Sequence, residues 1–293
     1  MARKKVFNNC RICGTHTQLT FEHVPPRAAF NDCPVVGKHI IDLINKNPDY
    51  YFDSKGHKSQ RGAGAYTLCK KCNNNTGTWY GTAFAKFAHQ SLDILKHTRG
   101  QPSLYYPFRI YPLRVIKQII TMFFSVNSDL FRLNHPDLVK FVLNKHERYL
   151  SPDIRILVYF NLGPHARFAG GTSISTTEID PNEVSLDTMD NLLSQYQHDY
   201  AKSLYSSEIA FPPLGYVLSF GLESLDSKLA DISFLAEYRY DDWTSIHLKL
   251  PIFPVNTWYP GDYRSKEQLR RNLEKNNQIE KENQERKQAE KNQ

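Results

Sequence analysis

The sequence predicts an α+β fold: a small cysteine-rich module at the N-terminal end, then a helical segment and a mostly antiparallel β domain. Two CxxC pairs lie within the first hundred residues, which is typical of a compact metal-bound unit. Apolar residues then recur at helical spacing, and β-branched and aromatic runs follow after residue 150. We expect three parts: residues 1–100, residues 101–262 and a charged tail of residues 263–293.

The helical segment begins with a run from Thr78, in which Trp79, Ala83 and Phe87 follow at four-residue steps. This spacing puts the three side chains on one helix face. Gly81 lies inside the run and disfavours a helix by about 1 kcal/mol relative to alanine, so the start of this helix is expected to be irregular. Further helices are predicted over 111–126, where a proline stands near the first turn, and over 135–145.

Four β-branched or aromatic runs, bounded by Gly, Pro, Asp and Asn, predict the strands of the antiparallel sheet. They span 154–163, 208–220, 231–240 and 245–253. The polar stretch 177–202 is predicted to be a loop with a short helix. From Ser265 onward the sequence is charged and has almost no apolar stripe, which predicts a helix that frays into a disordered tail.

The positive charge of the chain is concentrated at its N-terminal end. Residues 1–100 carry 15 Lys and Arg against six Asp and Glu, a net charge of +9, whereas residues 101–260 carry 13 against 17, a net charge of −4. A basic module of this kind suits a polyanionic partner such as nucleic acid, and a merely soluble basic domain is the alternative. The negative charge of the following segment argues against a second broad nucleic-acid surface.

The expected location is the cytoplasm. The basic start of the sequence lacks the apolar core of a secretory signal, and no run approaches the roughly 18 apolar residues of a membrane helix. No membrane association is therefore expected. In a reducing compartment, the five cysteines should be thiols, metal ligands or catalytic groups rather than disulfides.

The two CxxC pairs, Cys10 with Cys13 and Cys69 with Cys72, predict a structural zinc ion held by four thiolates. Each pair can place both sulfur atoms about 2.3 Å from one ion. Two separate redox-active CxxC units are the alternative. Cys33 falls outside the pattern, and we expect it to be an inert buried thiol.

A possible reactive group lies within the loop that the zinc would close. Glu22 and His23 precede two prolines, and Asn73 directly follows the last cysteine. The zinc would therefore bring a carboxylate, an imidazole and an amide oxygen together. The two oxygen groups suit Mg²⁺ or Mn²⁺ as a catalytic divalent metal, and a neutral histidine beside such an ion can take a proton from water.

Neighbours on a regular strand point to opposite faces, so Glu22 and His23 would not share a site in the middle of one. Pro25 and Pro26 cannot continue a central strand. We therefore expect the pair to lie at a strand end, where the backbone can turn both side chains toward one metal.

The stretches CRICG (10–14), LTFEHVPPRAAF (19–30) and YTLCKKCNNNTG (66–77) together resemble the HNH endonucleases, in their zinc-containing ββα-metal (treble-clef) form. The match covers residues 7–90, and the motif combination looks like one large bacterial branch. The resemblance implies that Glu22 and Asn73 are ligands of the catalytic metal, that His23 is the general base and that the cysteines hold zinc. It also implies a role in restriction, phage defence or a mobile element.

The sequence departs from that family's pattern at three points. Glu22 replaces a commoner aspartate, no asparagine stands near residues 64–65, where the middle Asn of the motif would fall, and Thr76 replaces a frequent lysine. Asn74 and Asn75 remain alternatives to Asn73 as the metal ligand.

The expected function is a metal-dependent endonuclease acting on nucleic acid, with DNA the first choice of substrate and RNA an alternative. Arg27, Lys70 and Lys71 flank the site and are candidate phosphate contacts. The rival hypotheses are a zinc-stabilised nucleic-acid-binding module without catalysis and a protein-interaction zinc domain. Residues 101–262 carry no assignable motif, and we expect them to recognise a protein partner, a second copy, a trigger or the local structure of the substrate.

Overall fold

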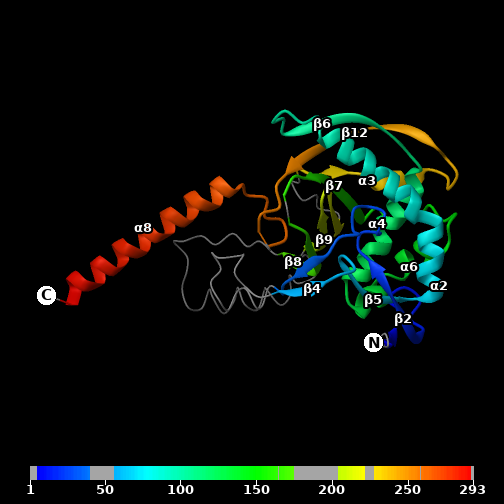
Figure 1. The fold of residues 1–293 in the computed structure, drawn as a ribbon, viewed down its shortest axis with the longest axis horizontal. Coiled ribbons are helices and arrows are strands. Elements are labelled where there is room, and N and C mark those ends of the chain that lie inside the picture. The colour runs from blue at the N-terminus through cyan, green and yellow to red at the C-terminus, as the bar shows by residue number, and fades with distance from the viewer. Residues whose placement is uncertain are drawn as a thin grey trace.

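The structure is a computed structural model that describes residues 5–39, 56–163, 165–174, 204–221, 228–257 and 259–291. It has a mixed α+β fold with four cysteines clustered near the N-terminus and a mostly antiparallel large sheet (Figure 1). The predicted fold class is therefore confirmed at this level. The predicted loop and helix of residues 177–202 lie outside the described residues.

A small three-stranded sheet forms the framework of the cysteine-rich segment. Its strands are β1 (Phe7–Asn9), β2 (His16–His23) and β5 (Gly64–Cys69), in the order β1-β2-β5 and all antiparallel. A separate pair, β3 (Val35–Gly37) and β4 (His57–Ser59), lies in the loop between β2 and β5. Residues 10–23 and 64–69 are thereby placed side by side.

A nearly continuous helical rod follows β5. It consists of α2 (Lys70–Thr76), the π-helical turn η1 (Gly77–Gly81) and α3 (Thr82–Leu95). The predicted helix is confirmed, although it starts eight residues earlier, because Cys69 caps the new start by accepting a hydrogen bond from the Cys72 backbone N–H. The irregularity expected at Gly81 takes the form of the wide π turn.

The other two predicted helices are confirmed as α4 (Pro112–Val126) and α6 (Pro136–Leu143), with the short α5 (Asp129–Asn134) between them. Helix α4 is buried on nearly every side. Its buried side chains are mostly apolar, as expected for a helix in the core of a protein. It packs against η1, α3 and α6, against β5 of the three-stranded sheet and against strands of the seven-stranded sheet described next.

The larger sheet contains seven described strands. They run in the order β6 (Ser103–Ile110), β12 (Thr244–Phe253), β7 (Ile154–Asn161), β10 (Leu214–Phe220), β9 (Leu204–Phe211) and β8 (Arg167–Ile174), with β11 (Ala230–Asp231) paired to β7. Only the β12–β7 pair is parallel among the described pairs. Strands β7 and β12 were expected from the sequence, whereas β6 and β8 were not.

Two strand predictions need correction. The run 208–220 forms two strands, β9 and β10, because Pro212 and Pro213 break it into a turn. The run 231–240 is mostly not a strand: Ser233–Glu237 form the 3-10 helix η3, which packs on α4. Its apolar side chains are buried by that contact rather than by sheet pairing, so its composition resembled that of a strand.

One main hydrophobic core joins the cysteine-rich segment to the large sheet. It includes Cys69 from β5, Phe84 from α3, Ile119 from α4, Ile209 from β9 and Leu248 from β12. Helix α4 therefore connects the two sheets. The boundaries at residues 100 and 262 stay a prediction.

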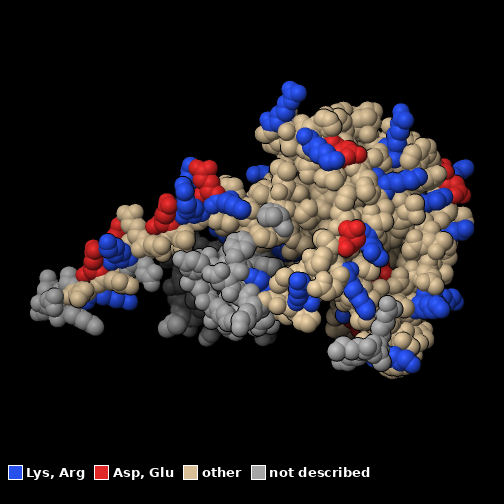
Figure 2. All heavy atoms as spheres, in the orientation of Figure 1, with Lys and Arg blue, Asp and Glu red and all other residues tan. Residues whose placement is uncertain are grey.

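The predicted C-terminal helix is present as α8 (Lys266–Lys291), which runs further than expected and extends away from the rounded body (Figure 1). Basic and acidic side chains both appear along it (Figure 2). None of the helices in the described part of the chain combines the length and the apolar character needed to cross a bilayer.

Candidate metal centre and active-site pocket

The four cysteines predicted to bind zinc meet at one point. Cys10 and Cys13 lie at the turn between β1 and β2, Cys69 ends β5 and Cys72 is in the first turn of α2. All four Sγ atoms lie within 4.8 Å of one another, and the Cys13 and Cys69 sulfurs are 3.8 Å apart. Sulfurs at 2.3 Å from a tetrahedral ion are about 3.8 Å apart, so the cluster can hold a metal such as zinc.

The surroundings of these thiols favour ionisation of Cys10, whereas burial raises the pKa of the Cys69 thiol. The Cys72 thiol donates to Cys10, which lowers the pKa of Cys10 to about 4, and this interaction together with burial raises the pKa of Cys72. A metal replaces such a shared proton when it binds. Both CxxC pairs converge on a single point, which favours one shared ion over two independent redox units. Cys33 is exposed rather than buried, because its loop lies outside the core.

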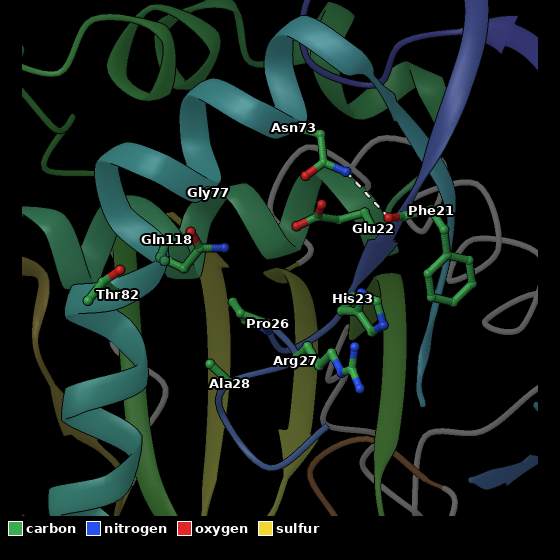
Figure 3. A pocket seen from close by; sticks show the side chains of 11 residues that line it. Phe21, Glu22, His23, Pro26, Arg27, Ala28, Asn73, Gly77, Thr82 and Gln118 are labelled. Carbon is green, nitrogen blue, oxygen red and sulfur yellow. Dashed lines mark hydrogen bonds between the residues drawn. The ribbon is translucent and has the colours of Figure 1, made fainter. Parts of the chain in front are cut away.

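A pocket of about 280 Å³ lies between the strand end of β2 and the helical rod that begins with α2 (Figure 3). It brings Glu22, His23, Arg27 and Asn73 together, whereas Lys70 and Lys71 lie exposed at the start of α2 and do not line it. The lining residues are Phe21, Glu22, His23, Pro26, Arg27, Ala28, Asn73, Gly77, Gly81, Thr82 and Gln118.

The amide of Asn73 is oriented by the strand beside it. Its Nδ2 donates to Thr20 Oγ1 at 2.9 Å and to the Phe21 carbonyl at 3.3 Å. The Thr20 hydroxyl uses its own hydrogen toward the Leu68 carbonyl, so it accepts from Asn73. The amide oxygen of Asn73 is therefore turned toward the pocket (Figure 3). Asn74 and Asn75 are not among the lining residues.

Glu22 places a buried carboxylate at the same end of the pocket. It is 7% exposed, and burial raises its pKa to about 8. No ion pair to Glu22 is found among the described residues. A buried carboxylate without a basic partner has a high affinity for a cation, because the cation restores the stabilisation lost with water.

His23 lies at the other end, beside Arg27 (Figure 3). Burial is the main cause that lowers its pKa, and the positive charges of Arg27 and Arg61 add to this, while a hydrogen bond to the Arg61 backbone opposes it. The imidazole is therefore neutral at pH 7 and able to accept a proton. Arg61 is a residue that sequence reasoning did not connect with the site.

The strand end explains how two neighbours reach one pocket. β2 ends at His23, and its pairing with β5 shifts register between Thr20 and Phe21, just before the pair. A bulge of this kind re-aims the side chains that follow it. Glu22 and His23 line the same pocket, but their side chains point to different parts of it, toward Asn73 and toward Arg27 (Figure 3).

Asn31 holds the loop that follows His23. Its Nδ2 donates to the carbonyls of Pro25 and Ala63, each at 2.7 Å, and its Oδ1 accepts from the Ala63 N–H, also at 2.7 Å. The neighbouring Gly62 and Gly64 have positive φ, and a Cβ at either would collide with Asn31 or with the Glu22 backbone. No asparagine stands near residues 64–65, yet Asn31 ties that backbone to the β2 end from a distant position.

Replacing Asn31 with alanine is expected to destabilise the fold by about 3 kcal/mol. The Pro25 carbonyl and the Ala63 N–H lose their bond to Asn31, and the Ala63 carbonyl keeps its bond from the Val24 N–H. Urea unfolding followed by tryptophan fluorescence measures the change. Asn74→Ala is the control, since Asn74 is exposed and its loss should cost less than about 0.5 kcal/mol. Equal stability of the two variants would contradict a tethering role for Asn31.

No protein-family model, curated protein or solved structure matches this chain. The HNH resemblance therefore rests on the motif residues alone.

Proposed function

We propose that this protein is a divalent-metal-dependent endonuclease of the HNH type that hydrolyses phosphodiester bonds of nucleic acid, with DNA as the expected substrate. The observation that carries the proposal is the pocket that Glu22, His23 and Asn73 line together. Asn73 directly follows Cys72, the last cysteine of the four-thiol cluster. The hairpin of β2 and β5 followed by α2 agrees with the ββα arrangement that the resemblance implies.

The residues divide the work by their chemistry. Glu22 and the Asn73 amide oxygen would hold a Mg²⁺ or Mn²⁺ ion, since both offer oxygen ligands from one end of the pocket. When bound, the ion stabilises negative charge on the scissile phosphate and its leaving oxygen. The neutral imidazole of His23 takes a proton from the attacking water. The four cysteines would hold structural zinc.

The charges around the pocket suit a phosphate backbone. Arg27 is exposed at the pocket rim, and Lys70 and Lys71 are exposed on the adjacent helix α2. Basic side chains are spread around the rounded body of the molecule (Figure 2). Arginine and lysine at such positions contact phosphates and orient the substrate without reading its sequence.

Nicking of supercoiled plasmid tests the proposal. Purified zinc-loaded protein should convert supercoiled DNA to open-circular and linear forms when Mg²⁺ or Mn²⁺ is added, and not when divalent metal is left out. If the protein binds DNA with a salt-dependent affinity but never cuts DNA or RNA, it is a nucleic-acid-binding zinc module. If it binds neither, a protein-interaction role replaces both.

The raised pKa of the buried Glu22 predicts how the stability of the fold depends on pH. Its pKa is raised to about 8 in the folded protein, so between pH 4.5 and 8 unfolding lets the carboxyl ionise, and stability falls as pH rises across that window. Glu22→Gln removes this effect. The variant should be more stable than the native protein by about 3 kcal/mol at pH 7 without divalent metal, and by almost nothing at pH 4.

Addition of Mn²⁺ should reverse that order. The ion should raise the melting temperature of the native protein, and more so at pH 8 than at pH 6, because binding must displace a proton from Glu22. Glu22→Gln should show no such rise and no cleavage. Thermal melts at several pH values with and without Mn²⁺ give both results. A rise of equal size in the two proteins would mean that the ion binds elsewhere.

A further inference from the structure

Gln118 contributes a polar group to the pocket from a distant part of the chain. It lies on α4, is 1% exposed and lines the pocket across from Glu22 and Asn73 (Figure 3). Its Oε1 is buried and has no hydrogen-bond partner among the described residues. Buried amide groups are normally paired, so an unpaired one at a pocket wall requires a reason.

The environment on α4 offers no structural reason for this glutamine. The neighbouring residues on the helix, such as Ile119 and Ile120, are fully buried and apolar. The other buried polar side chains nearby have partners: Lys117 donates to the carbonyls of Phe141 and Asn144, and Thr121 donates to the Lys117 carbonyl. A leucine at position 118 would suit such surroundings better than an unpaired amide.

The part of the pocket wall that η1 contributes beside Gln118 consists of two glycines. Gly77 and Gly81 line the pocket from the η1 turn, and a Cβ built on either would meet no atom within 4 Å. Single π turns of this kind are frequent at functional sites. The turn therefore leaves a volume beside the Gln118 amide. Nε2 points toward Glu22 and Oε1 toward Gly77 (Figure 3), and a half-turn of the terminal amide exchanges the two, so that Oε1 faces this volume.

We propose that Gln118 is a cation-binding residue of this site, which holds the water shell of the divalent ion through its carboxamide. An unpaired acceptor needs a donor. A phosphate oxygen without a proton cannot supply one, whereas Mg²⁺ and Mn²⁺ retain several waters whose hydrogens can. The inference rests on the proposed function in that it uses the same metal. It gives the segment after residue 100 a direct part in the site.

Manganese binding to the zinc-loaded full chain tests this assignment by titration calorimetry at pH 8, without nucleic acid. Gln118→Leu should weaken Mn²⁺ binding about tenfold, the usual effect of removing a group that supports metal ligands. Its melting temperature without Mn²⁺ should be unchanged or higher, because an unpaired buried amide is gone. Gln118→Glu keeps an oxygen at this point and adds charge, so it should bind Mn²⁺ at least as tightly as the native protein.

The matched control is Thr121→Val, one turn further along α4, which removes a buried hydroxyl that does not line the pocket. It should leave Mn²⁺ affinity unchanged. Native affinity in Gln118→Leu overturns the inference, and so does an equal loss in Thr121→Val, because the effect would then come from α4 packing. If the native protein never cuts nucleic acid but Mn²⁺ binding depends on Gln118 as stated, the proposed function fails and the inference stands.

Discussion

Replacing Cys69 with serine is expected to abolish zinc binding and to unfold at least the segment from β1 to α2. The four Sγ atoms join the β1–β2 turn, the end of β5 and the start of α2, in addition to the β1-β2-β5 sheet pairing. A structural zinc ion supplies on the order of 10 kcal/mol to such a unit, more than the whole stability of many domains. Cys69 also caps α2, but a serine hydroxyl can accept the same hydrogen bond, so the expected loss comes from the metal site and not from the helix start.

Zinc content by atomic absorption and melting by circular dichroism measure this result. Cys33→Ser is the matched control, because Cys33 is exposed and lies outside the four-cysteine cluster. The control should keep one zinc per chain and the native melting temperature. A Cys69→Ser protein with native zinc content and native melting would refute the four-thiolate site.

Replacing His23 with alanine is expected to lower the cleavage rate by roughly 10²- to 10⁴-fold, the usual contribution of a general base. The fold should survive, because His23 is only half-buried at a strand end, where its ring has an edge contact with Phe21 and a hydrogen bond to the Arg61 backbone. Zinc content should stay native. Affinity for DNA should also stay close to native, since Arg27, Lys70 and Lys71 remain.

The control for this variant is His16→Ala, an exposed histidine on the same strand. It should cut plasmid at the native rate. The native protein should also keep its activity below pH 6.5, because burial and the nearby arginines lower the pKa of His23. Single-turnover nicking across a pH series at saturating Mn²⁺ measures both. Equal rates for His23→Ala and native protein would remove His23 from the reaction.

These two variants separate the parts of the site. Cys69→Ser should fail through loss of structure and metal, whereas His23→Ala should fail in chemistry alone with its zinc retained. If His23→Ala also lost its zinc and its fold, the division into a structural cluster and a reactive pocket would be contradicted.

Local patterns predicted the helices well and the strands partly. The apolar spacing of 78–97 and the proline before 115 are signals carried by neighbouring residues, and both gave helices at the expected places. Residues 231–240 have a strand-like composition, yet η3 packs on α4 instead. Strand β6 was missed because it is an edge strand in which three successive exposed residues, Tyr105, Tyr106 and Pro107, interrupt the apolar pattern.

The predicted site residues divide in a similar way. The cysteine pairs and the Glu22–His23 pair are short motifs, and the structure brings Glu22, His23 and Asn73 to one pocket. Asn31 and Gln118 carry no motif. Their roles depend on which backbone or pocket lies opposite, and no spacing in the sequence encodes that.

The sequence by itself determined the α+β class, the main helices and the chemical groups available near the N-terminus, because periodicity and ligand spacing are properties of neighbouring residues. The tertiary structure alone decided that the Asn73 amide oxygen faces the pocket, that Glu22 is buried without a basic partner, and that α4 brings Gln118 to the same place. Orientation, burial and long-range contact arise only when segments far apart in the chain pack around one core.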